Sequence, residues 1–153
     1  MTTNKLETDI TLVNDKVRFS GTTRNIPEVF MDYFPPVGDG EGFTGLEMLL
    51  LSLSGCSATA IAVLLRKMNK NVGGLAVHAT GTRQETAPFA FTRIDLEYTL
   101  TSSDATSDDL QKVIRLAETN MCPVWAMLKG NVEIVVETKI NAQQKKNSGT
   151  LNK

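Results

Sequence analysis

The chain has few of the residues that build metal sites or basic binding surfaces. Its 153 residues include one histidine and two cysteines, and no carboxylates cluster around them in a pattern that would complete a zinc site. The 16 lysines and arginines are balanced by 17 acidic residues, and the body of the chain has no basic cluster. We therefore expect no metal or other cofactor, and neither nucleic acid nor a membrane surface as the main partner.

The N-terminal segment MTTNKLETD lacks the apolar run of a signal peptide, which favours a cytoplasmic protein. In a reducing compartment, Cys56 and Cys122 are not expected to form a permanent disulfide. A transient disulfide between them is compatible with such a compartment. A composition of 41% hydrophobic and 22% charged residues is typical of a soluble globular protein. We assign residues 1–140 to a single domain and residues 141–153 to a flexible polar tail.

The longest apolar stretch covers residues 44–68. From Met48 to Leu65 the thiol of Cys56 is its single ionisable group, and large apolar residues cover every side of a helical projection. This pattern predicts a helix that is buried all round. Thr44 and Glu47 predict a capping box at its start. The length raises the question of a membrane span, but four hydroxyl residues and a glycine favour a core helix instead.

Alternating apolar and polar residues predict strands before and after this helix, at residues 6–12, 16–21, 28–34, 75–80, 94–100 and 132–136. The first three strands are expected to form an antiparallel meander. Ser107 is the expected cap of a second helix that ends near residues 119–120, and Pro123 suits the first position of a third. The predicted order βββ-α-ββ-αα-β describes an α+β fold. His78, on the polar side of its strand, is expected to have a structural or solvent role.

Each cysteine has two interpretations. Cys56 lies among small residues that would let a backbone or a ligand come close, but a lone cysteine in an apolar helix is most often a packing residue. Cys122 precedes Pro123 and is expected at a helix N-cap, where free N–H groups lower the pKa of a thiol.

Three motifs, in this order, resemble those of the OsmC/Ohr family of hydroperoxide-reducing proteins. They are GFTGLEMLLLSLSGC, which ends at Cys56, ETAPFAFTRI, which begins at Glu85, and MCPV, which contains Cys122. The resemblance covers most of the chain. It implies an OsmC-like fold with antiparallel sheets wrapped around a long central buried helix, in an intertwined homodimer.

The resemblance also implies a chemistry. Cys56 would be the peroxidatic cysteine and Cys122 the resolving one, reducing organic hydroperoxides through a sulfenic acid and a Cys56–Cys122 disulfide. A thiol reductant, such as a dihydrolipoyl protein, would reopen the disulfide. Because Cys56 is in mid-helix, where no free N–H group stabilises a thiolate, it needs a cation from elsewhere in the fold. Arg18 and Arg24 are the two candidates.

The family's glutamate is matched most nearly by Glu47, whose alternative role is the helix cap alone. Nine positions separate Glu47 from Cys56, which places them on opposite sides of the helix and about 13 Å apart along it. If Glu47 assists a Cys56, we therefore expect it to be the one in the partner subunit.

Two functions remain open at this point. The first is the thiol peroxidase just described. The second is a non-catalytic OsmC-like protein that binds a small lipophilic ligand at the dimer interface, with both cysteines as packing residues. A cysteine hydrolase is disfavoured because His78, the only histidine, is poorly situated to serve as a base.

Overall fold

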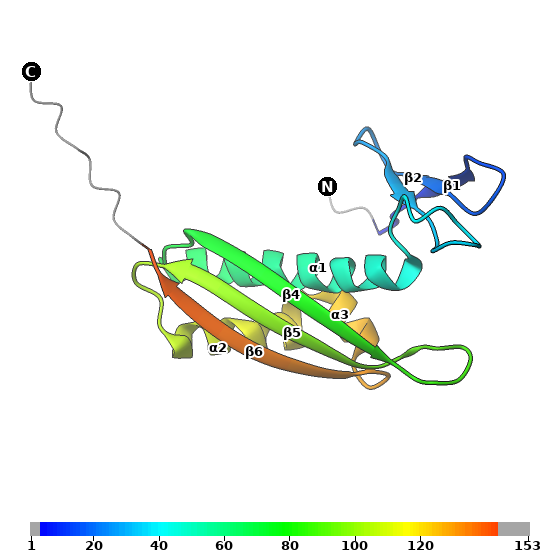
Figure 1. Cartoon of the computed structure of the whole chain (residues 1–153). Coiled ribbons are helices and arrows are strands. Elements are labelled where there is room, and N and C mark those ends of the chain that lie inside the picture. Colours follow the sequence, from blue (N-terminus) through cyan, green and yellow to red (C-terminus); the bar gives the residue numbers. More distant parts are fainter. Residues whose placement is uncertain (1–3, 144–153) are drawn as a thin grey trace, which may run out of the picture. The chain divides into compact units, whose positions relative to one another are not determined.

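The computed structural model describes residues 4–143, and its chain divides into two compact units, Met1–Leu49 and Leu50–Lys153. The predicted order of helices and strands is confirmed (Figure 1). A π-helical turn lies between the last two helices. The assignment of residues 1–140 to one domain stays a prediction. Asn141 and Ala142, which the sequence assigns to the tail, are the last residues of a strand, and residues 144–153 lie outside the described residues.

The first unit contains a three-stranded antiparallel sheet in the order β1-β2-β3, which confirms the predicted meander. Its strands are β1 (Asp9–Leu12), β2 (Phe19–Thr22) and β3 (Val29–Met31), all shorter than the sequence pattern suggests. Residues of β1 are exposed along its whole length, including Ile10 at 58% and Leu12 at 50%. This sheet alone therefore buries little apolar surface. A sheet of this size needs an apolar face packed against another element to be stable.

Helix α1 (Gly45–Lys67) begins at the predicted capping box. The Thr44 N–H donates to Glu47 Oε2 at 2.8 Å, and the Glu47 N–H donates to Thr44 Oγ1 at 3.3 Å. The prediction of burial on all sides is wrong for the single chain. Along α1, all of which the structure describes, burial follows one stripe, and Leu51 on another side is 49% exposed. The buried stripe consists of Leu53, Ser57, Ala60, Ile61 and Leu65.

The second unit contains a three-stranded sheet in the order β4-β5-β6. Strands β4 (Gly74–Arg83) and β5 (Phe91–Ser102) are antiparallel, whereas β6 (Glu133–Ala142) runs parallel to β5. The expectation of antiparallel sheets is therefore wrong for this pair. The parallel pair arises because α2 (Ser107–Leu116), η1 (Ala117–Met121) and α3 (Pro123–Leu128) form a crossover that returns the chain to the same end of the sheet.

The helices cover one face of this sheet and leave the other open (Figure 1). From Ile94 to Ser102, every second residue of β5 is buried on the helix side, and these residues are Ile94, Leu96, Tyr98, Leu100 and Ser102. The alternate residues, among them Asp95 and Glu97, lie on the polar face. The core of this unit therefore forms between β5 and the apolar stripes of the helices.

The cap of α2 differs from the prediction by one residue. Thr106, not Ser107, is the N-cap, and its Oγ1 accepts a 3.2 Å hydrogen bond from the Asp109 N–H. The Asp109 carboxylate in turn accepts the Thr106 N–H at 2.9 Å, which completes a capping box. Two adjacent hydroxyl residues are both suitable caps by type, and the position of the acidic residue three places later favours Thr106.

We expect Thr106→Ala to lower the free energy of unfolding by about 1 kcal/mol, because the capping hydrogen bond is lost. Ser107→Ala is the matched control, since Ser107 Oγ accepts a long 3.4 Å bond from Gln111 and caps no N–H group. Urea unfolding followed by circular dichroism measures both variants. An effect of Ser107→Ala equal to or larger than that of Thr106→Ala would contradict the assignment of the cap.

Candidate thiol site

The two cysteines lie on different helices of the second unit, and both are free thiols. Cys56 is half-buried on α1, directly before the buried Ser57. Cys122 is only 2% exposed and is the N-cap of α3, with Pro123 in the first turn, as predicted. Its sulfur accepts a 3.4 Å hydrogen bond from the Trp125 N–H. The prolyl residue has no N–H of its own, so this start of the helix leaves few donors unpaired.

The fold brings the two thiols together although they are far apart in the chain. The Cys56 thiol lies close enough to Cys122 to affect its ionisation. Burial and then the neighbouring Cys56 thiol raise the pKa of Cys122 to about 11, and the Trp125 N–H opposes them without prevailing. The prediction of a lowered pKa at this N-cap is therefore wrong. Removal from water destabilises the thiolate more than one or two N–H donors stabilise it.

A buried tyrosine holds α1 against β5 beside the thiols. The Tyr98 hydroxyl, fully buried, donates to Ser57 Oγ at 2.7 Å, and Ser57 Oγ donates to the Leu53 carbonyl at 2.8 Å. Burial raises the pKa of Tyr98 to about 12, and the charge of a Cys122 thiolate would raise it further. The phenol is therefore a neutral hydrogen-bond donor at physiological pH.

Neither Tyr98 nor Ser57 is singled out as a site residue by the sequence analysis. The signal is present, because the alternation of β5 places a phenol on the buried face, and a buried phenol needs a polar partner. The partner is hidden because Ser57 is one of several small residues around Cys56.

A surface hollow of about 180 Å³ reaches Cys122 from the side of η1 and α3. Its lining consists of Glu118, Thr119, Asn120, Met121, Cys122, Pro123 and Ala126. Cys122 is therefore a buried residue that also borders a surface depression.

The predicted cation Arg18 lies in the first unit, in a cluster with Glu41 and Phe30. Its Nη1 is 2.6 Å from Glu41 Oε2, and its Cζ is 4.6 Å from the centre of the Phe30 ring. Such a guanidinium is held by a charged hydrogen bond on one side and a ring on the other. Arg18 Nε is buried and has no hydrogen-bond partner among residues 4–143.

The two other predicted residues differ in their surroundings. Arg24 is exposed in a turn and has a positive φ of 50°. Glu47 serves the cap of α1, where its Oε2 accepts bonds from both the N–H and the hydroxyl of Thr44. The structure thus brings Arg18 together with Glu41 rather than with Glu47. The position of Arg18 beside Cys56 and a catalytic role for Glu47 both stay predictions.

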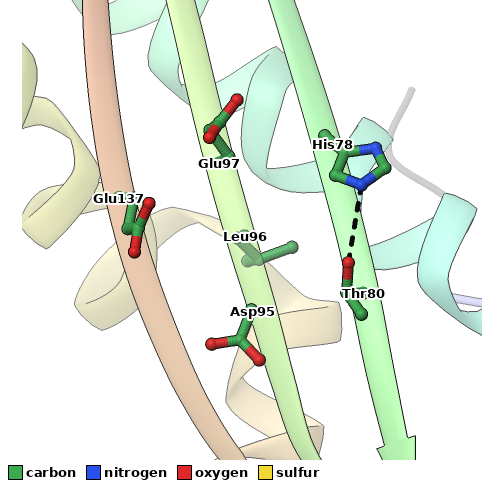
Figure 2. A pocket seen from close by; sticks show the side chains of 6 residues that line it. All are labelled: His78, Thr80, Asp95, Leu96, Glu97 and Glu137. Atoms are coloured by element: carbon green, nitrogen blue, oxygen red, sulfur yellow. Dashed lines mark hydrogen bonds between the residues drawn. The ribbon is translucent and has the colours of Figure 1, made fainter.

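His78 lies in a separate hollow on the open face of the second sheet (Figure 2). The hollow has a volume of about 270 Å³, and His78 Nε2 is 3.5 Å from Thr80 Oγ1. In the register of β4 and β5, His78 pairs with Glu97 and Val77 pairs with Tyr98, so the histidine and the tyrosine lie on opposite faces. His78 is therefore on the polar side, as predicted, with the sheet between it and the thiols.

We expect Cys122 to be alkylated by iodoacetamide at pH 8 on the order of 100-fold more slowly in the folded protein than in guanidinium chloride. A pKa of about 11 leaves a far smaller thiolate fraction than an ordinary thiol has, and only the thiolate reacts. Mass spectrometry of the Cys122 peptide gives both rates. The folded rate should rise as the pH approaches 11, and equal rates at pH 8 would contradict the raised pKa.

Comparison with known proteins agrees with the fold and the motifs. The model of the family described as OsmC-like protein matches residues 38–137. Protein YhfA of Escherichia coli strain K12 is 33% identical over 89 residues, which are 58% of this chain and 66% of YhfA, just under two thirds of its length.

Two solved structures show the same fold. A hypothetical protein from Aquifex aeolicus VF5 has a TM-score of 0.81 at 21% identity, covering 93% of this chain and 100% of the other. An organic hydroperoxide resistance protein from Elizabethkingia anophelis has a TM-score of 0.67 at 19% identity, covering 92% and 99%. Because the family model spans well over half of the sequence, the chain belongs to the OsmC-like protein family.

Proposed function

We propose that this protein is a thiol-dependent peroxidase that reduces organic hydroperoxides. The Cys56 thiolate attacks the terminal oxygen of the hydroperoxide, the O–O bond breaks, and the alkoxide leaves as an alcohol after taking a proton. Cys56 becomes a sulfenic acid. The Cys122 sulfur then attacks the Cys56 sulfur, water leaves, and a disulfide forms. A dithiol reductant restores both thiols by exchange and is itself oxidised to a disulfide.

The contact between the two thiols is the observation that carries this proposal. Condensation of a sulfenic acid requires a second sulfur that reaches the first before further oxidation, and Cys122 is near enough to Cys56 for the two thiols to interact. The raised pKa of Cys122 keeps it protonated at neutral pH. Because only a thiolate attacks a peroxide readily, this supports Cys122 as the resolving thiol rather than the attacking one.

We assign the cation of the first step to Arg18 rather than to Arg24. Arg18 is fixed by Glu41 and Phe30 and still has a buried Nε without a partner among the described residues. A buried donor without a partner is costly, which favours a further ligand such as a thiolate or a peroxide oxygen. Arg24 is exposed in its turn, where burial does not orient its side chain.

The comparisons support the same direction. One neighbour of the same fold is named as an organic hydroperoxide resistance protein. We propose an organic hydroperoxide as the substrate and the cytoplasm as the location. Helix α1 is long and apolar enough to cross a membrane by length and composition, a test that core helices of soluble proteins also pass. The depression at Cys122 is where we place the approach of the thiol reductant, for which a dihydrolipoyl protein is the candidate.

The decisive measurement is the count of free thiols before and after one equivalent of cumene hydroperoxide. We expect the wild type to lose two thiols per chain, because Cys56 is oxidised and Cys122 condenses with it. Cys56→Ser should lose none. Cys122→Ser should lose its one remaining thiol with the first equivalent, and a second equivalent should convert its sulfenic acid to sulfinic acid, which mass spectrometry detects, because no partner traps the sulfenic acid. A wild type that keeps both thiols is not a peroxidase.

The alternative function, binding of a small lipophilic ligand without catalysis, is favoured by one observation. The first unit has a hollow of about 330 Å³ with mainly apolar walls. Ile10, Ile26, Val29, Met31 and Met48 are among its lining residues. If cumene hydroperoxide oxidises no thiol, this hollow becomes the leading site, and binding of a fluorescent fatty acid would test it.

We further propose that two copies of the chain associate through the exposed side of α1. Leu51 is 49% exposed on this helix, and a Cβ built on Gly55 would meet no atom within 4 Å in the single chain. A long helix that is apolar on all sides but buried on one stripe has a second side to cover. A glycine at that side permits close approach of another helix.

We expect Gly55→Leu to convert the dimer to a monomer, because the larger side chain separates helices that meet at Gly55. In the single chain the substitution fills open space and improves helix propensity by about 1 kcal/mol, so the fold should persist. Light scattering after size exclusion gives the mass, and circular dichroism gives the fold. Lys67→Leu, at the exposed last residue of α1, is the control. A Gly55→Leu protein that stays dimeric would place the interface elsewhere.

A further inference from the structure

A buried carboxylate organises the loop between β3 and α1. Asp32 is 4% exposed and accepts three backbone N–H groups. The Tyr33 N–H donates to Oδ1 at 2.8 Å, and the Asp39 and Glu41 N–H groups donate to Oδ2 at 3.1 Å each. Burial acts to raise the pKa of Asp32, but these donors and the charge of Arg18 outweigh it, so the pKa lies below its usual value. The ionised carboxylate therefore ties both ends of the loop together.

The loop is packed tightly around this carboxylate. A Cβ built on Gly38 would overlap the Tyr33 carbonyl oxygen and Asp32 Oδ1, and it would lie 2.8 Å from the Tyr33 carbonyl carbon. Overlap of this kind means that glycine is required here unless the backbone moves. The loop backbone is close-packed around Asp32, so the side chains of the loop extend from a backbone that is held in one position.

Two acidic side chains of this loop reach the segment that leads into β2. Asp39 pairs with Lys16 and accepts a hydrogen bond from Asn14 Nδ2. Glu41 pairs with Arg18 at 2.6 Å. The N–H groups of both acidic residues are bound by Asp32, so one buried carboxylate sets the position of both ion pairs.

We propose that Asp32 is a positioning residue for Arg18, acting through Glu41: by holding the Glu41 backbone, it fixes the carboxylate that orients the guanidinium. The inference rests on the proposed function insofar as Arg18 serves the peroxide step. It places Glu41 beside Arg18, whereas Glu47 is the residue that most nearly matches the family's glutamate in sequence. The Glu47 carboxylate is engaged by Thr44 at the helix cap, whereas Glu41 is in direct contact with Arg18.

The first test measures the chemical accessibility of Arg18 and does not depend on activity. Phenylglyoxal labels arginine, and mass spectrometry of the Arg18 peptide gives the rate. We expect Glu41→Gln and Asp32→Asn each to raise this rate several-fold. The amide introduced by Asp32→Asn replaces an acceptor with a donor that faces backbone N–H groups, so the loop loosens. Asp39→Asn, which removes a charge from the same loop but keeps its N–H bond to Asp32, should label at the wild-type rate.

The second test measures the second-order rate of Cys56 oxidation by cumene hydroperoxide. We expect Asp32→Asn and Glu41→Gln each to lower it by about 10-fold or more, because a misplaced catalytic partner costs rates of this order. In the double variant, Asp32→Asn should add nothing to the effect of Glu41→Gln, since both act through the same contact. If Asp32 had a purely structural role, Asp32→Asn would slow the oxidation of Cys56 by the same factor in the wild type and in the Glu41→Gln variant.

The outcomes separate this inference from the proposed function. If cumene hydroperoxide does not oxidise the wild type, the proposed peroxidase function is wrong. The labelling of Arg18 still decides whether Asp32 positions Glu41 against Arg18. The inference is overturned if Arg18 of the Asp32→Asn variant is labelled at the wild-type rate. It is also overturned if Asp32→Asn slows Cys56 oxidation as much in the Glu41→Gln variant as in the wild type. Should Asp32→Asn fail to fold, Gly38→Ala disturbs the same loop without removing any charge, and it must raise Arg18 labelling in the same way.

Discussion

The hydrogen bond from Tyr98 to Ser57 is the contact on which the thiol pair depends. It joins β5 to α1 in the core of the second unit, one residue from Cys56, and both partners are fully buried. A buried phenol that donates to a buried hydroxyl favours a single position, because any slip of the helix would leave the phenol without its acceptor. The position of the Cys56 sulfur relative to the start of α3 follows from this register.

Burial then determines the protonation state of Cys122. A thiol at the start of a helix usually ionises more readily, but removal from water and the neighbouring Cys56 thiol raise the pKa of Cys122 to about 11. A neutral Cys122 does not repel a thiolate on Cys56, and it can attack once Cys56 has become electrophilic. The order of the proposed cycle therefore follows from the protonation of Cys122.

The sequence predicts the elements well and their contacts less well. Periodicity indicates the long helix and the strand order, and the motifs around Cys56 and Cys122 indicate the family. The parallel pairing of β6 is not predicted, because alternation within a strand carries no information on its direction. Burial of α1 is overestimated, because composition shows that a helix is apolar but not how many of its sides one chain covers.

The choice between Glu41 and Glu47 shows where sequence spacing stops being informative. Glu47 fits the family pattern nearly in position, but the capping of α1 already uses its carboxylate, since the Thr44 N–H and hydroxyl both bind Oε2. Glu41 has no signal of its own in the sequence. Its contact with Arg18 depends on a loop whose shape is set by three backbone bonds to Asp32, and backbone donors are the same in every residue type except proline. A side chain that is positioned through main-chain hydrogen bonds is therefore identified from the structure. The sequence shows only Asp32, which accepts those bonds, and Gly38, which leaves room for them.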